Sequence, residues 1–287
     1  MQMTVDYNPV SVKTKKITET KIQVLEAAFL QQEQVECSVV HRFGPNIYIR
    51  EVTIPAGTLS IGHYQTTTHL NVMLTGRVTM IDENGGYTEL TAPHTFVSGP
   101  GRKIGQIHEK MIWQNIYATN ETDIEKLELM FIRKSQTWQE DQKNQRLVLS
   151  FNRSANEADY YAAISEYGFS HETVQNQVQN LADQTNMPHG AYKMTIAESN
   201  LDGKGVFATG NIAANEIIAP ARIKGKRTPA GRFVNHTKNP NAKMVLLPNG
   251  NVDLVALSNI AGCKGGQLGD EITINYRQAL NLVLKGA

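Results

Sequence analysis

Short apolar runs separated by turn signals fill the sequence between residues 35 and 90, and this pattern limits the possible folds more than any other feature. The runs are residues 38–40, 46–54, 59–64, 71–74, 77–81 and 88–90. The turn signals between them are Gly44-Pro45, Pro55-Ala56-Gly57, Thr75-Gly76 and Asn84-Gly85-Gly86. Glycine, proline and asparagine favour turns because of their backbone preferences, and apolar runs this short favour strands over helices. The first half of the chain is therefore predicted to be an antiparallel sandwich or a jelly-roll barrel.

The composition is that of an ordinary globular protein. The chain has 287 residues, of which 40% are hydrophobic and 19% charged, which is enough for one large domain or two of common size. Because 28 basic residues nearly balance 27 acidic ones, the overall charge gives no support to binding of nucleic acid or of an anionic membrane. The two cysteines, Cys37 and Cys263, are too far apart in sequence to indicate a disulfide framework or a thiolate zinc site. No apolar run is long enough to span a membrane and residues 1–8 lack the apolar segment of a signal peptide, so we expect a cytoplasmic protein.

Five polar and glycine positions in the β-rich half have the spacing of a metal-binding motif. Gly57, His63, Gln65, His69 and Gly76 follow one another at offsets of six, two, four and seven residues. This spacing resembles the first motif of the cupins, with Gln65 in place of the second histidine and His69 in place of the glutamate. The resemblance implies a barrel that holds a divalent metal through His63, Gln65 and His69, since imidazole suits transition metals. The alternative is a barrel whose inward histidines are satisfied by hydrogen bonds alone.

The rest of the cupin resemblance covers residues 40–120 and is weaker at the second motif. The sequence S-G-P-G at 98–101 is similar to the turn of that motif, but no histidine follows where the ligand belongs. The passage 99–128 resembles a cupin-like module of bacteriophage-encoded proteins, in which a tryptophan-bearing strand leads into a D-x-E-K-L-E helix. Residues 1–134 are therefore assigned to a cupin-like domain, through which the chain could also form a homo-oligomer.

The segment 135–190 is predicted to be a helical connector. It is rich in Gln, Asn and Glu and lower in apolar residues than its surroundings. Ser154 and Glu157 form a capping box at the start of one helix, and Ser170 is a second N-cap candidate. The helices either link two domains or help to build the substrate groove of the second, and the sequence leaves both roles open.

The last hundred residues return to a β pattern and hold four unusual segments. The first three read G-K-G-V-F-A at 203–208, I-A-A-N-E-I-I at 212–218 and G-R-F-V-N-H-T-K-N-P-N-A at 231–242. The fourth reads G-D-E-I-T-I-N-Y at 269–276. The asparagines of the third segment favour a fixed irregular loop, because Asn bonds to its own main chain and tolerates left-handed backbone geometry.

In this order the four segments resemble the SET domain of protein-lysine methyltransferases. The resemblance covers residues 192–278 and implies a β-clip fold over 191–287, in which the 231–242 segment passes beneath the one ending in Tyr276 in a knot-like crossing. Thr237, Lys238 and Asn275 depart from the family pattern, residues 262–268 form an insertion before the last segment, and the zinc-binding cysteine clusters are absent. The polar side chains of the 231–242 segment are candidates to satisfy buried main-chain groups at the crossing.

The resemblance also implies a cofactor, S-adenosylmethionine, and the residues that hold it. These residues are Gly203, Lys204, Gly205, Arg232, Phe233, Asn235 and His236. The glycines suit a close approach because they carry no Cβ atom. Tyr276 is the catalytic candidate, whose hydroxyl would orient the amine and the methyl group for in-line transfer. The acceptor lysine must first lose a proton, since a free lysine has a pKa of about 10.4, and the sequence shows no dedicated general base.

The function predicted from the sequence is that of an enzyme, a SET-type methyltransferase joined to a cupin-like module and encoded by a bacteriophage or a bacterium. Its partner would be a protein substrate with an accessible lysine in the cytoplasm, the host cytoplasm if the chain is phage-encoded. One alternative is a non-catalytic binding, virion or assembly protein that retains both folds. Another is metal chemistry at His63 and His69.

Overall fold

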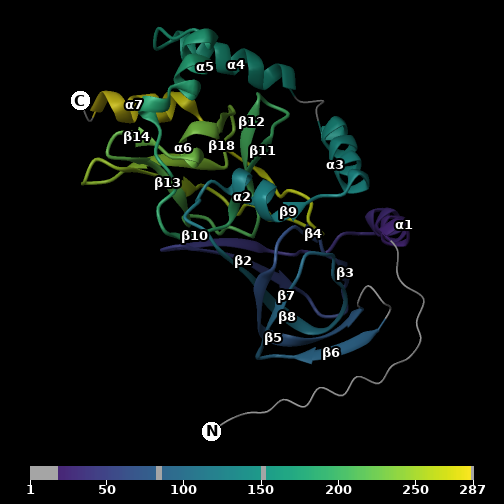
Figure 1. Ribbon diagram of the computed structural model, residues 1–287. Coiled ribbons are helices and arrows are strands. Elements are labelled where there is room, and N and C mark those ends of the chain that lie inside the picture. The colour runs from purple at the N-terminus through teal and green to yellow at the C-terminus, as the bar shows by residue number, and fades with distance from the viewer. Residues whose placement is uncertain (1–18, 82–85, 150–152, 286–287) are drawn as a thin grey trace.

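The computed structural model describes residues 19–81, 86–149 and 153–285. Its N-terminal part is one strongly curved sheet (Figure 1). Its eight strands run in the order β10-β1-β2-β8-β5-β6, with β3 paired to β8 and β7 paired to β5. The strands are β1 (Val39–Gly44), β2 (Ile47–Ile54), β3 (Leu59–Ile61), β5 (His69–Ile81), β6 (Tyr87–Thr91), β7 (His94–Ser98), β8 (Ile104–Ala118) and β10 (Gly190–Tyr192). All of their pairings are antiparallel, as the sequence predicted.

The sheet is open, and no closed barrel is found in the part of the chain that the structure describes. Within the described ranges no pairing joins the two edge strands, β6 and β10. Instead β6 and β7 pair with different halves of β5, and β2 and β3 pair with different parts of β8, so the sheet folds over itself without closing. The structure thus shows a mainly β protein with additional helices.

One predicted turn is a bulge inside a strand. Thr75-Gly76 was expected to separate two strands, but β5 runs through it without a break. The register of β5 against β8 shifts on both sides of Thr75, and Gly76 has a φ of 96°, as an inserted residue at a bulge requires. A Cβ atom at Gly76 would lie 2.7 Å from the carbonyl oxygen of Lys110, so only glycine fits here.

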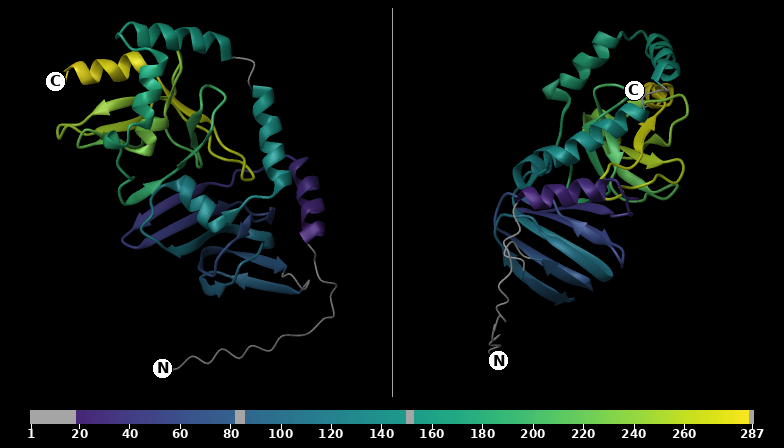
Figure 2. Two further views of the ribbon diagram at one scale, coloured as in Figure 1. Left: turned by 45° about the horizontal axis from the view of Figure 1, so that its top comes forward. Right: turned by 90° about the vertical axis from the view of Figure 1, so that its right-hand side faces the viewer.

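Helices cover the end of the curved sheet and lead to the C-terminal half (Figure 2). They are α1 (Glu19–Leu30), α2 (Ile124–Phe131), α3 (Gln136–Leu149), α4 (Arg153–Ser165), α5 (His171–Gln179) and the 3-10 helix η2 (Leu181–Asp183). Helices α1 and α3 pack side by side, and the short strands β4 (Tyr64–Gln65) and β9 (Ile132–Arg133) pair beneath them. Ser170 caps α5 as predicted, and Asp123 caps α2. The side chain of Ser154, the other predicted cap, lies outside the described residues.

The C-terminal half consists of two small sheets and two helices. One sheet has the order β11-β12-β18-β15 and the other β14-β13-β17-β16. The strands are β11 (Met194–Glu198), β12 (Lys204–Ala208), β13 (Ile217–Ile223), β14 (Lys226–Arg227), β15 (Asn235–His236), β16 (Ala242–Leu246), β17 (Val252–Ala256) and β18 (Glu271–Ile274). The helices are α6 (Pro229–Phe233) and α7 (Tyr276–Lys285). No helix in the described ranges is both long enough and apolar enough to cross a bilayer.

The segment that follows α6 crosses β18 and is held there by side-chain hydrogen bonds. Strand β15 pairs in parallel with β18, and the Thr237 N–H donates to the Ile274 carbonyl at 3.0 Å. The Asn241 amide donates to the Glu271 carbonyl at 2.8 Å and its oxygen accepts from the Thr273 N–H at 2.9 Å. Asn241 therefore satisfies buried main-chain groups, as expected from the sequence.

The two halves share a core and a sheet edge. One cluster of buried apolar side chains extends from Tyr48 of β2 to Leu254 of β17. Strand β10 adds to the outer edge of β1, with His41 opposite Tyr192. The predicted 262–268 insertion packs against the N-terminal half, where the Gly265 N–H donates to the Val35 carbonyl at 2.7 Å.

Gly231 of α6 packs so closely against Ala221 of β13 that there is no room for a side chain. A Cβ atom at this position would lie 2.1 Å from the carbonyl oxygen of Ala221. Because the nearest atoms are backbone, Gly231→Ala is expected to lower the free energy of unfolding by about 1–3 kcal/mol, as overpacking of a filled core does. Denaturant unfolding followed by circular dichroism measures the change.

Gly99→Ala is the matched control, since a Cβ atom at Gly99 meets nothing within 4 Å and its φ is not positive. It should leave the unfolding midpoint close to that of the wild type. Equal midpoints for both variants would contradict the close packing of α6 on β13.

Candidate functional site

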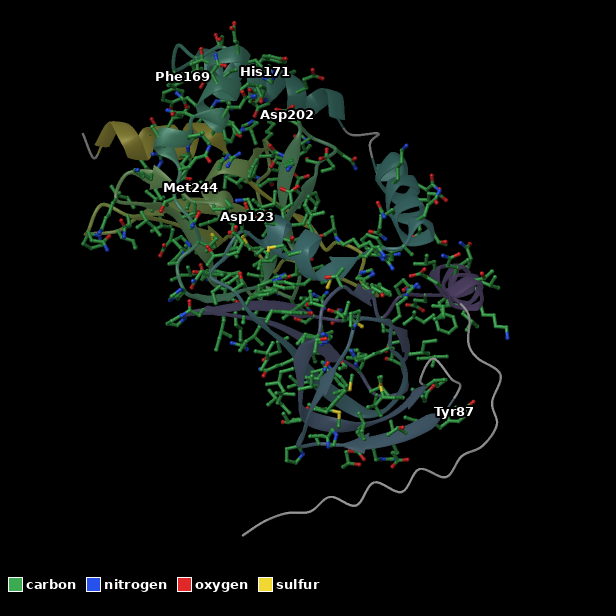
Figure 3. The ribbon with its side chains drawn as sticks, in the orientation of Figure 1. Tyr87, Asp123, Phe169, His171, Asp202 and Met244 are labelled. Atoms are coloured by element: carbon green, nitrogen blue, oxygen red, sulfur yellow. The ribbon has the colours of Figure 1, made fainter. Side chains whose placement is uncertain are left out.

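A cavity of about 360 Å³ lies between helices α4 and α5 and the C-terminal sheets. The predicted site residues on its lining are Gly203, Lys204, Arg232, Phe233, Asn235, His236 and Tyr276. Figure 3 labels His171 on α5 and Asp202 in the turn before β12, two further lining residues. Of the cofactor and catalytic residues predicted from the sequence, Gly205 alone is missing from the lining. Three segments far apart in the sequence therefore meet at one cavity.

The two glycines before and in β12 are needed for different reasons. Gly203 has a φ of 47°, in the left-handed region that side chains disfavour, and nothing lies within 4 Å of where its Cβ would be. A Cβ atom at Gly205 would lie 2.3 Å from a carboxylate oxygen of Glu271. Gly205 thus makes room for a buried acid of this chain, and it does not face the cavity.

Asn235 ties three segments together through its side chain. Its amide nitrogen lies 3.2 Å from the Asp202 carbonyl, 3.1 Å from the Lys204 carbonyl and 2.8 Å from Glu271 Oε1. Glu271 also accepts from the Ser199 hydroxyl, and burial raises the pKa of this carboxyl although both of these hydrogen bonds lower it. The Asn235 side chain therefore fixes the turn before β12 against β18, while its main chain pairs with β18.

His236 connects Tyr276 to the connector helix α4. The Tyr276 N–H donates to His236 Nδ1 at 3.1 Å, so the imidazole is neutral and Nε2 carries its proton. Nε2 donates to Asp159 Oδ2 at 2.9 Å. Burial lowers the pKa of His236, and the hydrogen bond and the charge of Asp159 act in the opposite direction. Arg277 donates to both oxygens of Asp159, at 3.2 and 3.1 Å, and holds this carboxylate in place.

Aromatic rings form one wall of the cavity. The ring centroids of Tyr276 and His236 are 5.2 Å apart, and those of Tyr276 and Tyr160 are 6.0 Å apart, both edge to face. The Tyr276 hydroxyl donates to the Val234 carbonyl at 3.1 Å, and burial raises its pKa, so it is protonated at neutral pH. Such rings present their electron-rich faces to a cation.

Basic side chains form the opposite wall, around the ring of Phe233. The Arg232 guanidinium lies 4.4 Å from its centroid and Lys204 Nζ 5.9 Å. Lys204 is paired with both oxygens of Glu125 at 2.6 and 2.7 Å. Arg232 donates to Gln184 at 2.8 Å, but its Nε is buried without a hydrogen-bond partner.

Sequence reasoning missed the contribution of the connector. Tyr160 and Tyr161 of α4 and His171 of α5 line the cavity, and Asp159 positions His236. The sequence left open whether these helices build a groove, and the structure shows that they line one. The signal available was the Asp-Tyr-Tyr run, but nothing in the sequence indicated the face of the helix that it occupies.

Of the predicted metal ligands, His69 begins β5 of the N-terminal sheet, Gln65 lies in the short strand β4, and His63 precedes β4. In the part of the chain that the structure describes, no group of three or more His, Cys, Asp or Glu side chains is placed to hold a metal ion. His69 Nδ1 contacts the Thr67 carbonyl at 2.9 Å, which leaves Nε2 as the acceptor, and Lys103 Nζ lies 3.5 Å from it. Gln65 accepts from the Tyr117 hydroxyl. His63 is buried and packs edge to face on Trp138. The residues of the cupin motif thus offer no ligand set in this arrangement.

Comparison with known proteins finds likeness only in solved structures. No protein-family model matches the chain, and no curated protein matches it. A cupin domain from Bordetella pertussis is similar with 13% identity and a TM-score of 0.26, over 31% of this chain and 98% of its own. An RmlC-like cupin from Ralstonia eutropha is similar with 18% identity and a TM-score of 0.24, over 29% of this chain and 57% of its own.

A third similar structure is an RmlC-like cupin with a double-stranded β-helix fold from Methanocaldococcus jannaschii. It has 14% identity and a TM-score of 0.24, over 31% of this chain and 85% of its own. At these scores the likeness carries no conclusion about activity. The comparisons show neither a SET domain nor a bacteriophage relative.

The link between Asp159 and His236 can be tested by titration. Asp159→Asn removes the charge that raises the pKa of His236, so the imidazole of the variant should titrate at lower pH than that of the wild type. The pKa is read from the Cε1–H resonance in an NMR titration, assigned with a His236→Asn spectrum.

Glu166→Gln is the control, because Glu166 binds the same Arg277 at 2.7 and 2.9 Å without contributing to the pKa of His236. Its His236 resonance should titrate as in the wild type. An unchanged or raised pKa in Asp159→Asn would refute the proposed link.

Proposed function

We propose that this protein is an S-adenosylmethionine-dependent methyltransferase of the SET type that transfers a methyl group to a lysine of a protein. The observation that carries the proposal is the meeting of three distant segments, 203–204, 232–236 and Tyr276, around one cavity of about 360 Å³. Those segments were selected from the sequence by their order and motifs alone. The crossing of the segment after α6 with β18 also supports a SET fold with its knot-like passage.

The side chains around the cavity fit the chemical groups of the cofactor. A sulfonium cation suits the wall formed by Tyr160, Tyr276 and His236, since aromatic rings attract cations. A carboxylate suits Arg232, whose Nε is buried and has no partner. The ring of Phe233 beside it offers a flat apolar surface for stacking. The lining therefore accommodates a molecule with one cationic and one anionic end.

The residues of this chain would bind and orient the reactants. When bound, the cofactor supplies a methyl group already activated by the sulfonium. The Tyr276 hydroxyl donates a hydrogen bond to the Val234 carbonyl. Its oxygen therefore keeps lone pairs that can accept a hydrogen bond from the attacking amine. The aromatic wall excludes water, and desolvation lowers the pKa of the acceptor lysine so that its neutral form becomes accessible. Alignment and desolvation supply the acceleration, with no covalent intermediate.

The N-terminal sheet is proposed to be a cupin-like module. Antiparallel strands in a curved sheet and an enclosed interior support this assignment. We propose that the module belongs to a phage-encoded or bacterial enzyme working in the cytoplasm of the cell that makes it. A virion or assembly role without turnover is the outcome that the following experiment separates from catalysis.

Tyr276→Phe tests the catalytic assignment. Labelled S-adenosylmethionine and a bacterial lysate should give a labelled protein with the wild type, and the variant should transfer label on the order of 100-fold more slowly, as loss of one positioned hydroxyl does. Cofactor affinity, measured by calorimetry, should change little, because the ring and its packing are kept.

Tyr192→Phe is the matched control. Tyr192 also donates its hydroxyl to a main-chain carbonyl, that of Pro188 at 3.0 Å, but it lies outside the cavity. This variant should transfer label as fast as the wild type. Cofactor binding without any labelled protein would indicate a non-catalytic binder, and absence of cofactor binding would overturn the proposal.

A further inference from the structure

A second cavity, of about 480 Å³, lies inside the curved N-terminal sheet. Residues of strands β2 and β8 line it, together with Glu26, Phe29 and Leu30 of α1 and Trp138 of α3. Gly265 and Gly266, from the insertion in the C-terminal half, complete the lining. Much of the wall is apolar, with Ile54, Val78 and Met111 among its residues. The cavity is thus a partly open, largely apolar space built from both halves of the chain.

Arg50 lines this cavity, and its Nε has no hydrogen-bond partner among the described residues. Alternation along β2 places Arg50 on the same face as Val52 and Ile54, and all three line the cavity. Arg50 Nε is buried and has no hydrogen-bond partner. Across the described ranges the guanidinium makes no ion pair either. Arg50 is half-buried, and a buried guanidinium nitrogen without a hydrogen-bond partner costs stability, which indicates that the position serves a ligand.

Two further side chains of the lining, Lys103 and Trp138, can donate to a ligand. Lys103 has no carboxylate partner, and burial lowers its pKa to about 8, so it is mostly charged at pH 7. The indole Nε1 of Trp138, a residue 8% exposed, is buried without a partner. Burial lowers the pKa of His63 to about 3, so this ring is neutral, and its Nδ1 has no partner. The unsatisfied groups therefore favour an acceptor-rich guest.

The acids near the cavity do not neutralise Arg50. Glu26 lines the cavity but binds Arg102 at 2.5 and 3.3 Å. Glu128, whose charge also interacts with that of Arg50, is hydrogen-bonded to Lys134 at 2.7 Å. Glu33 also lines the cavity, but it is exposed. The enclosed part of the lining consequently keeps a net positive character.

We propose that this cavity binds a small organic carboxylate with an apolar body, its carboxylate held by Arg50 and its body against the apolar wall. The planar guanidinium fork matches a carboxylate in a two-point hydrogen bond. The same positive lining opposes a metal cation, and Lys103 Nζ lies 3.5 Å from Nε2 of the nearby His69. This proposal is independent of methyl transfer, since no residue of the first cavity lines the second.

Calorimetry on the full chain with phenylacetate, hexanoate and indole-3-acetate tests the proposal. At least one of these carboxylates should bind, and its matched amide should bind at least tenfold more weakly. Arg50→Met should weaken carboxylate binding at least tenfold, the loss expected for a charge-assisted hydrogen bond. The melting temperature of Arg50→Met should equal or exceed that of the wild type, since an unpaired buried cation is removed.

Arg77→Met is the matched control, because Arg77 lies on β5 outside the cavity and pairs with Glu89 and Glu109 at the surface. It should bind the carboxylate as the wild type does. If Arg50→Met does not fold, Lys103→Met takes its place with the same expected loss.

Three outcomes would overturn the proposal. They are equal binding of carboxylate and amide, no binding of any carboxylate in the series, and unchanged affinity in Arg50→Met. Inorganic phosphate that binds as tightly as the carboxylates, or Mn²⁺ that binds and is lost in His63→Ala, would assign the cavity to a different ligand and likewise refute a carboxylate site.

Discussion

The hydrogen bonds between Asn241 and the main chain of β18 are the constraint on which the C-terminal half depends. They hold the segment that follows α6 across β18, so that Asn235 and His236 lie beside Thr273 and Ile274. The same segment is also joined to Tyr276 directly, since the Tyr276 N–H donates to His236 and its hydroxyl donates to the Val234 carbonyl. The first cavity therefore exists because two short polar contacts replace the longer strand pairing that an ordinary sheet would use.

Each half of the molecule contributes side-chain contacts or lining residues to the other. The connector helix α4 supplies Asp159 to the ring of His236, and α2 supplies Glu125 to Lys204. In return, Gly265 and Gly266 of the C-terminal half complete the lining of the cavity in the N-terminal sheet. Both cavities thus lie where elements of distant sequence meet, which is where ligand sites commonly form. Their polarity differs, since one offers aromatic faces to a cation and the other an unpaired guanidinium to an anion.

Local signals in the sequence predicted local structure well. Ser170 caps its helix, the 46–54 run forms β2, and Asn241 satisfies main-chain groups, because each of these depends on neighbouring residues or on a polar side chain that must find a partner. Of the cofactor and catalytic residues that the ordered motifs selected, all but Gly205 line the first cavity.

Non-local features could not be predicted in the same way. Whether the curved sheet closes depends on which parts of β5 pair with β6 and with β7. The Thr75-Gly76 bulge has the sequence of a turn, so it could not be distinguished from one. The roles of Asp159 and Arg50 depend on the faces that α4 and β2 present after packing, and a single sequence does not fix those faces.

The pairing of β10 with β1 has a consequence for the synthesis of the chain. A strand edge with free N–H and C=O groups is a template for pairing with other chains, and β1 offers such an edge until β10 covers it. Because β10 follows the connector helices, the ribosome must complete residues 190–192 before the N-terminal sheet can protect itself. This edge of the nascent sheet is therefore open to pairing with other chains for the whole time that the connector is being made.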